Sequence, residues 1–287
     1  MTSTLQAHIR PLLVMMLVLF IIDILGRAIL VRRVISPKDL LANLTSWGVE
    51  TLARNAVFPL RYALFVFVAS CVPWSAPSSV ATWVAAYVLV DLSYYWKHRW
   101  LHHNGLLWSM HKPHHSIQVL TADSALRLGW FQRLFDDFFY LPLVLFGFSP
   151  WTILMAVELN HIYQWWCHCE WIGRVPFLDS WLNTPSNHRL HHSSDEHQVQ
   201  HNFGSTFMIW DRLFGTYQPE PESPLSFGVQ TGYTGSNPFL FQLTPVVLYF
   251  RDVARSLRKV NEIPTTDTST SQVENSGLPR SKPHPLQ

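Results

Sequence analysis

Four apolar runs constrain the fold of this chain more than any other feature. The first, residues 11–31, matches the ~20 residues that a helix needs to cross a ~30 Å hydrocarbon layer. Two more cover residues 56–72 and 80–96, and a longer block covers residues 138–163. Charged residues make up only 14% of the 287 residues, well below the roughly 25% of soluble domains. The runs therefore predict membrane helices.

Interruptions within these runs refine the prediction. Asp23 and Arg27, in the first run, are four residues apart and can pair on one helical face. A cleaved signal peptide is the alternative, but a single Arg precedes the run and no small-residue cleavage site follows it, which favours an uncleaved span. Residues 37–55 are expected to form an interfacial helix. Gly147 and Pro150 break the block 138–163, which predicts a helical hairpin that enters and leaves from one side.

The distribution of Lys and Arg predicts the orientation. Residues 32–38 and 97–112 are basic, whereas the loop 73–79 has no charge. Because cytoplasmic loops are enriched in Lys and Arg, both basic segments are expected in the cytoplasm. The predicted fold is an all-α, multi-pass integral membrane protein. It has about three to four spans, a helical hairpin, and a histidine-rich helical cap on the cytoplasmic side.

Four regions follow from this pattern. Residues 1–96 are expected to hold the N-terminal transmembrane helices and the interfacial helix. Residues 97–220 form the histidine-rich catalytic region, with the membrane hairpin at 134–166. Residues 221–261 form a loop and an amphipathic helix, and residues 262–287, rich in Thr, Ser and Pro, a disordered tail. A net charge of +2 gives no basic face for nucleic acid, and three Cys make no disulfide framework.

Histidines are concentrated in one part of the chain, since only His8 and His284 of 15 lie outside residues 98–201. Positions i, i+3, i+4 and i+7 share one face of a helix, so histidines at these spacings can direct their imidazoles at one point. Metal–nitrogen distances of about 2 Å require such convergence. Pro113 is expected to place its group at a helix start or an irregular turn. The groups are His98 and His102; His111, His114 and His115; His161 and His168; and His188, His191 and His192.

Ten histidines exceed what one metal ion binds, since a structural zinc site is saturated by four ligands. They therefore predict two metal ions in one cavity. Imidazole suits iron, zinc, copper and nickel alike, so the ligand type does not select the metal. His103, His197 and His201 have no partner at these spacings and are expected to be exposed or to support the ligands.

Metal-bound imidazoles need their second nitrogen held by a hydrogen-bond partner. Asp91 precedes His98 by seven residues on the same helical stripe, and an interfacial anchor is its alternative role. Gln164 falls between His161 and His168. The candidates for a supporting or catalytic role are Asp91, Gln164 and Asn202, with Asn187 and Asp211 as further ones.

Several segments of this chain resemble one known family. They are "DLSYYWKHRWLHH", "LLWSMHKPHHS", "ALR", "LNHIYQWWCHCEWIG", "LNTPSNHRLHH" and "NFGSTFMIWDRLFGTY". Between residues 90 and 217 the chain is similar to the fatty acid hydroxylase/sterol desaturase superfamily of membrane oxygenases. Its motif spacing is most similar to the branch of alkylglycerol monooxygenase and bacterial sterol desaturase-like proteins.

The resemblance implies that the ten grouped histidines bind metal. Members use a non-haem di-iron centre, O2 and an external electron donor, which implies two iron ions, a membrane lipid substrate and an electron-donor protein or diffusible reductant. Some relatives have HxxxH where this chain has His161 and His168, so the second member of this pair departs from the family pattern.

The predicted function is that of an O2-dependent di-iron oxidoreductase. It would hydroxylate or desaturate a C–H bond of a fatty acyl, sterol or ether lipid, since breaking that bond is beyond side-chain acids and bases. A membrane zinc protein, hydrolytic or structural, would use the same histidines. A metal transporter would place them near the middle of the spans, whereas here they fall at span ends.

Overall fold

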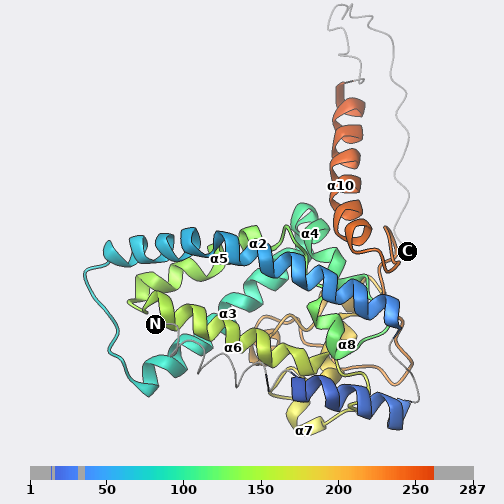
Figure 1. The fold of residues 1–287 in the computed structure, drawn as a ribbon, viewed down its shortest axis with the longest axis horizontal. Coiled ribbons are helices and arrows are strands. Elements are labelled where there is room, and N and C mark those ends of the chain that lie inside the picture. Colours follow the sequence, from blue (N-terminus) through green and yellow to red (C-terminus); the bar gives the residue numbers. More distant parts are fainter. Residues whose placement is uncertain (1–13, 15–16, 32–35, 262–287) are drawn as a thin grey trace, which may run out of the picture. The chain divides into compact units, whose positions relative to one another are not determined.

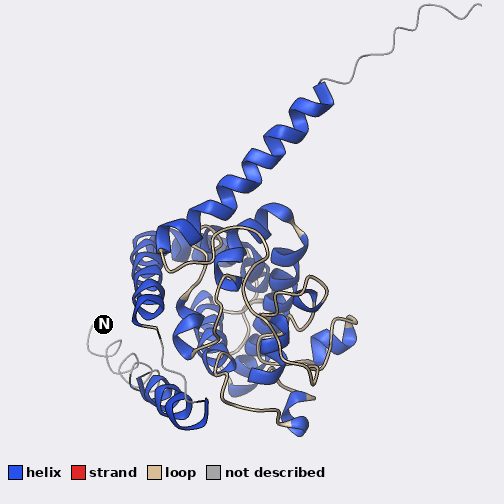
Figure 2. Ribbon diagram, turned by 90° about the vertical axis from the view of Figure 1, so that its right-hand side faces the viewer, coloured by secondary structure: helices blue, strands red, loops and turns tan. Residues whose placement is uncertain are grey.

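The computed structural model describes residue 14, residues 17–31 and residues 36–261 (Figure 1). These residues form helices and loops, with two isolated β-bridges and no strand among them (Figure 2). The predicted tail 262–287 and the start of the run 11–31 lie outside the described residues. The chain divides into two compact units between Tyr249 and Phe250, and every residue of the candidate site belongs to the first.

The helices have the following bounds. After a helix at residues 17–26 come η1 (Arg27–Val31), α2 (Pro37–Ser70), α3 (Val80–His103), α4 (Gly105–His115), η2 (Ala122–Leu126), α5 (Arg133–Tyr140), η3 (Leu141–Phe146), α6 (Pro150–Cys167), α7 (Pro176–Asp179), α8 (Pro185–His191), η4 (Gln198–Gln200), α9 (Ile209–Leu213) and α10 (Pro238–Asn261).

Helix α2 combines two segments that the sequence analysis treats separately. The expected interfacial helix at 37–55 and the apolar run at 56–72 form one helix of 34 residues, which Ser36 caps at its N-terminus. A change from polar to apolar side chains alters what surrounds a helix but not its backbone hydrogen bonds, so nothing ends the helix near residue 55. Of the described helices, α2 alone is long and apolar enough to qualify as a membrane span.

The apolar core lies where α3 packs against α6, with contributions from α2 and η3. It consists of Phe65, Ala86, Val90, Tyr140, Leu143, Val144, Phe148, Ile153, Ala156 and Val157. The turn between η3 and α6 depends on Gly147, whose φ is 84° and whose added Cβ would lie 3.0 Å from the Ala76 backbone nitrogen. Only glycine fits there, because both the backbone conformation and the space exclude a side chain.

Asp23 and Arg27 attach the helix of residues 17–26 to the rest of the protein. Asp23 accepts hydrogen bonds from the Ala122 backbone N–H (3.1 Å) and from Trp171 Nε1 (3.0 Å). Arg27 donates to the Leu120 carbonyl (2.6 Å) and lies 3.6 Å from a carboxylate oxygen of Glu170. Both side chains are buried. These two charges therefore hold the helix to the segment that leads into η2, to the first residue of η2 and to the segment after α6.

Candidate metal centre

A single asparagine brings the first two histidine groups together. Asn104 ends α3, and its side-chain oxygen accepts hydrogen bonds from the Leu106 and Leu107 backbone N–H groups at 3.1 Å, which caps α4. With only this residue between the helices, α4 turns back beside the end of α3. His102 near the end of α3 therefore faces His111 on α4, with ring centroids 5.1 Å apart.

The other two groups come from the ends of α6 and α8. His168 is the C-cap residue of α6, and His192 is the C-cap residue of α8. Thr184 caps the N-terminus of α8, and its hydroxyl donates to the Asp179 carboxylate. Asn187 donates to the Asp179 and Leu182 carbonyls at 2.9 and 3.0 Å. These contacts fix the short helix on which the last histidines lie.

Nine imidazoles gather into two groups. One nitrogen of each member lies within 4.8 Å of such a nitrogen in every other member of its group. All nine side chains are at most 6% exposed. The five-residue group consists of His98, His102, His111, His115 and His191, and the four-residue group of His114, His168, His188 and His192.

The spacing of nitrogens within each group matches the spacing of ligands around one ion. Nε2 of His111 lies 3.2 Å from Nε2 of both His98 and His115. Nε2 of His188 lies 3.2 Å from that of His168 and 3.0 Å from that of His192. With metal–nitrogen bonds of about 2.1 Å, ligands at right angles are about 3.0 Å apart and tetrahedral ligands about 3.4 Å.

The tautomers of two histidines give a stronger argument for a cation. His98 Nδ1 lies 3.0 Å from the Phe203 carbonyl, which only accepts, so Nδ1 carries the proton. His111 Nδ1 donates to the Gln132 side-chain oxygen at 2.8 Å. Both Nε2 atoms are therefore unprotonated, and their lone pairs face each other at 3.2 Å. Two such lone pairs repel, and a cation between them removes the repulsion.

Unpartnered atoms and protonation agree with this reading. Nε2 of His102 and of His191 are buried and have no hydrogen-bond partner within the described part of the chain. Burial lowers the pKa of His111 and of His168 to about 4, and that of His191 to about 3. At neutral pH these imidazoles are uncharged, so their lone pairs are free to bind a metal. The residues present fit a metal site.

One sequence-predicted ligand, His161, lies in neither group. Seven residues of α-helix span about 10 Å along the axis, so His161 and His168 share a face of α6 without reaching one point.

The two polar candidates inside the helices contact other parts of the fold. The Asp91 carboxylate accepts hydrogen bonds from the Thr206 and Phe207 backbone N–H groups, Trp210 Nε1 and Asn160 Nδ2, with no imidazole among these donors. The Gln164 side chain donates to Asn160, while its backbone carbonyl accepts from His168 Nδ1 at 3.1 Å. Gln164 thus contacts a grouped histidine through its main chain.

Asn202 lies between two carbonyls that hold imidazoles. The His201 carbonyl accepts from His191 Nδ1 at 2.9 Å, and the Phe203 carbonyl accepts from His98 Nδ1 at 3.0 Å. Asn202 has a φ of 59°, the left-handed conformation that asparagine tolerates better than most residues. Asp211, whose pKa burial raises to about 6, accepts from the Phe203 and Gly204 backbone N–H groups. Nδ1 of His103 and Nδ1 of His201 donate instead to the Arg99 and His197 carbonyls.

Two features of the site differ from the sequence analysis or escape it. Pro113 lies in the last turn of α4, so its group ends a helix rather than starting one, and Asn104 supplies the irregular turn instead. Gln132, which holds His111, has no histidine at helical spacing and lies just before α5, so the histidine pattern does not single it out.

Comparisons with known proteins agree with this geometry. Residues 83–216 match the family model for fatty acid hydroxylase. Alkylglycerol monooxygenase of Xenopus tropicalis is 36% identical over 176 residues, 61% of this chain and 38% of that protein. The human alkylglycerol monooxygenase is 37% identical over 150 residues, 52% of this chain and 33% of that protein. Ornithine lipid hydroxylase OlsE of Rhizobium tropici is 31% identical over 163 residues, 56% of this chain and 48% of that protein.

The chain therefore spans between 33% and 38% of the length of these two alkylglycerol monooxygenases. No solved structure matches it. The family match includes both histidine groups, from His98 to His192. Residues 83–216, a little less than half of the chain, thus match the fatty acid hydroxylase family.

Proposed function

We propose that this chain is a lipid hydroxylase whose two histidine groups hold two iron ions. The observation that carries the proposal is the pair of unprotonated nitrogens, Nε2 of His98 and Nε2 of His111, at 3.2 Å. The relatives add the chemical class, since their names describe monooxygenases and lipid hydroxylases. With nine imidazoles in two groups, the protein would offer up to five ligands to one ion and up to four to the other.

The proposed reaction is R–H + O2 + 2 H⁺ + 2 e⁻ → R–OH + H2O. The C–H bond breaks, one oxygen atom enters the lipid, and the other is reduced to water. Bound iron would supply the redox chemistry that activates O2, and an external reductant would supply the two electrons. Side chains alone do not perform this step.

The chain's own residues would hold the ions and exclude water. Neutral imidazoles would leave the positive charge of bound ions uncompensated by the ligands. Main-chain carbonyls of Phe203, His201 and Gln164 fix three of the rings, so the ligands are held before an ion arrives. We propose Asn202 and Gln164 as residues that support the ligands in this way. Asp91 would hold the 206–210 segment against α3.

We further propose that the histidine groups lie at the cytoplasmic surface of a multi-pass membrane domain. Large apolar side chains are exposed on several helices, among them Ile29 (69%), Leu60 (75%) and Val80 (81%). Exposed apolar surface of this extent indicates contact with lipid. The bilayer would then surround residues 17–31, the second half of α2, the first part of α3, and the α5–α6 pair.

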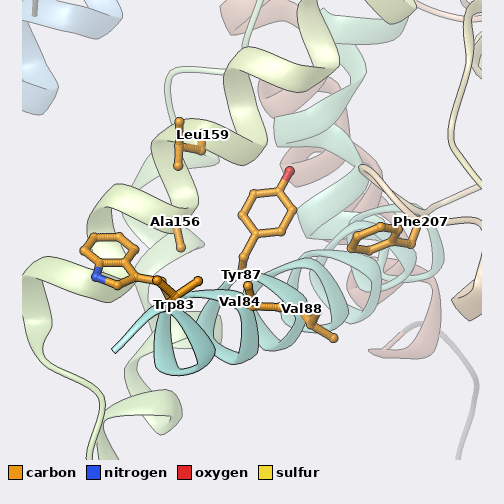
Figure 3. A pocket seen from close by; sticks show the side chains of 8 residues that line it. Trp83, Val84, Tyr87, Val88, Ala156, Leu159 and Phe207 are labelled. Atoms are coloured by element: carbon orange, nitrogen blue, oxygen red, sulfur yellow. The ribbon is translucent and has the colours of Figure 1, made fainter. Parts of the chain in front are cut away.

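An apolar cavity between α3 and α6 is a candidate position for an alkyl chain. Its volume is about 330 Å³, and Tyr87 and Phe207 are among the residues that line it (Figure 3). Volumes of about 300–1,000 Å³ are typical of small-molecule sites. Eleven residues separate Tyr87 from His98, so the cavity lies about 16 Å along α3 from that histidine. A lipid with a long alkyl chain is the proposed substrate class.

Metal analysis together with a lipid oxidation assay tests the proposal. We expect about two iron ions per chain in protein purified after iron-replete expression. With a chemical reductant and ¹⁸O2, we expect one labelled oxygen atom in an alkylglycerol, ornithine lipid or sphingolipid substrate. Zinc without iron under these conditions would favour the zinc protein and overturn the oxygenase. A product with a new C=C bond and no label would make it a desaturase.

A further inference from the structure

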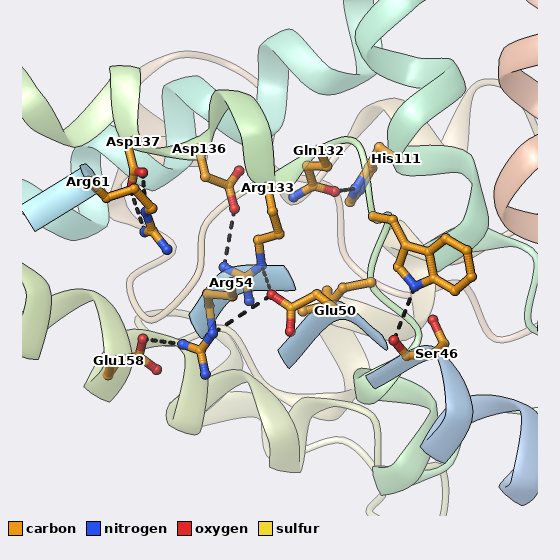
Figure 4. A network of polar contacts seen from close by, with 12 residues as sticks. Ser46, Glu50, Arg54, Arg61, His111, Gln132, Arg133, Asp136, Asp137 and Glu158 are labelled. Atoms are coloured by element: carbon orange, nitrogen blue, oxygen red, sulfur yellow. Dashed lines mark hydrogen bonds and ion pairs between the residues drawn. The ribbon is translucent and has the colours of Figure 1, made fainter. Parts of the chain in front are cut away.

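A cluster of ionised side chains lies buried beside His111 of the five-residue group (Figure 4). Lys97 on α3 lies 3.2 Å from the Asp136 carboxylate on α5, and their side chains are 2% and 5% exposed. Arg133 lies 3.2 Å from Asp136 and 2.8 Å from Glu50 of α2. Burying an ion costs several kcal/mol, and paired buried ions seldom add net stability over apolar residues. Stability alone therefore does not account for the cluster.

Gln132 joins this cluster to His111. Its side-chain oxygen accepts from His111 Nδ1 at 2.8 Å, and its NH2 group points toward the Asp136 carboxylate (Figure 4). Gln132 is itself buried, at 6% exposure. A continuous path therefore runs from Lys97 through Asp136 and Gln132 to the imidazole.

The side-chain partner distinguishes His111 from the other grouped histidines. His98, His114, His168 and His191 donate from Nδ1 to main-chain carbonyls. Among the grouped imidazoles, His111 alone has a side chain as the hydrogen-bond acceptor for Nδ1 in the described structure. A carbonyl of the main chain always accepts, whereas a free amide can present either its oxygen or its NH2 group. Something must set the orientation of Gln132.

The carboxylate of Asp136 sets that orientation. An ionised carboxylate only accepts, so Gln132 must direct its NH2 group at Asp136 and its oxygen at His111. The proton of His111 then stays on Nδ1, and the lone pair of Nε2 points at His98 and His115. Lys97 keeps Asp136 ionised and in place. The Lys97–Asp136 ion pair therefore fixes the tautomer of His111 through the side-chain amide of Gln132.

We propose that Gln132, oriented by the Lys97–Asp136 ion pair, is a positioning residue that fixes the ring and tautomer of His111 for the ion of the five-histidine group. The inference rests on the proposed function, because it requires that group to bind a metal. Partners of this kind change metal affinity by 10–100-fold when they are removed. The effect falls on one ion only, since Gln132 contacts none of the four histidines of the second group.

The test compares two buried glutamines. Gln132→Leu removes the acceptor of His111. Gln242→Leu is the matched control: Gln242 is fully buried and bonds the Trp130 backbone N–H, Ser46 and the Leu128 carbonyl, but no imidazole. The full-length chain in detergent micelles, stripped of metal, would be titrated with Co²⁺ and followed by its visible absorption, with thermal unfolding measured in parallel.

The proposal predicts that wild-type chain and Gln242→Leu bind two Co²⁺ ions with equal affinity. In Gln132→Leu one ion binds 10–100-fold more weakly, and the other is unchanged. Wild-type affinity for both ions in Gln132→Leu overturns the inference and leaves the proposed function standing. Failure of the wild-type chain to bind two ions overturns the proposed function itself.

A second variant covers the case in which Gln132→Leu does not fold. Gln132→Glu keeps an oxygen acceptor for His111, and Lys97 and Arg133 compensate the added charge beside Asp136. We expect both Co²⁺ affinities to stay within about threefold of wild type. If the five-histidine group of a folded Gln132→Glu chain binds its Co²⁺ ion tenfold or more weakly than wild type, the role assigned to Gln132 is wrong.

Discussion

Replacing Asn202 tests how the loop at residues 201–203 holds the imidazoles. The Asn202 side chain donates to the Asn187 carbonyl (3.0 Å) and to the Gln218 carbonyl (2.7 Å), and accepts from the Gln218 backbone N–H (2.9 Å). Each hydrogen bond contributes about 1 kcal/mol net. At a φ of 59°, alanine costs a further ~1 kcal/mol. Asn202→Ala should therefore lower the free energy of unfolding by about 4 kcal/mol.

Asn202→Gly separates the two causes. Glycine adopts a positive φ freely, so this variant loses the hydrogen bonds without the backbone penalty and should be about 1 kcal/mol more stable than Asn202→Ala. Chemical denaturation of the metal-free chain in detergent micelles measures both values. Both variants should also retain less iron after dialysis against a chelator, because the His201 and Phe203 carbonyls no longer hold His191 and His98 in place.

Either of two results would contradict the role assigned to Asn202. Equal stability of the alanine and glycine variants would show that the left-handed conformation contributes nothing. Wild-type iron retention in both variants would show that this loop does not support the metal ligands.

Three further predictions follow from the site. His114→Ala and His191→Ala should each lose metal and activity together while membrane insertion persists, whereas His197→Ala should keep both metal and activity. Metal analysis of the membrane-inserted variants measures this. Full activity of His114→Ala or His191→Ala contradicts the assignment of that histidine as a metal ligand. Asp91→Asn should lower the thermal midpoint and keep two ions per chain, since no imidazole donates to Asp91; loss of either ion contradicts this. Acidifying the metal-free chain below pH 6.5 should destabilise it, because imidazoles in the unfolded chain gain protons, whereas His111 and His168, with pKa values of about 4, stay neutral until lower pH. Each of these two histidines then lowers the free energy of unfolding by about 1.4 kcal/mol per pH unit. A free energy of unfolding that stays constant from pH 7 to 5 excludes buried neutral imidazoles.

Local spacing predicted the parts of the site that lie on one helix. His98 and His102 on α3, and His111 and His115 on α4, are four residues apart, and each pair joins the same group. The match to the fatty acid hydroxylase family confirms the resemblance that these motifs carry. Helical periodicity fixes such neighbours because they lie within two turns of each other.

Helical spacing did not predict which histidines meet when the two residues lie far apart along the helix axis. His161 and His168 share a face of α6, yet about 10 Å of helix separates them, and only His168 at the end of α6 joins a group. The division of the nine grouped histidines between two groups was likewise not predictable, because it depends on how α3, α4, α6 and α8 pack.

Partners that come from loops had no sequence signal at all. Gln132 reaches His111 from the start of α5, and the carbonyls of His201 and Phe203 reach their rings from an irregular segment. Every residue has a main-chain carbonyl, so the sequence does not show which carbonyls accept hydrogen bonds from the imidazoles. For α2, the change of composition near residue 55 does not end the helix, which continues to Ser70.

Anomalous X-ray scattering at the iron edge, from crystals of the iron-loaded chain, tests the central claim most directly. The account predicts two peaks in each chain. One should lie about 2 Å from Nε2 of His98, His111 and His115, and the other about 2 Å from Nε2 of His168, His188 and His192. A single peak, or peaks away from these nitrogens, would contradict the assignment of two metal ions to the two histidine groups.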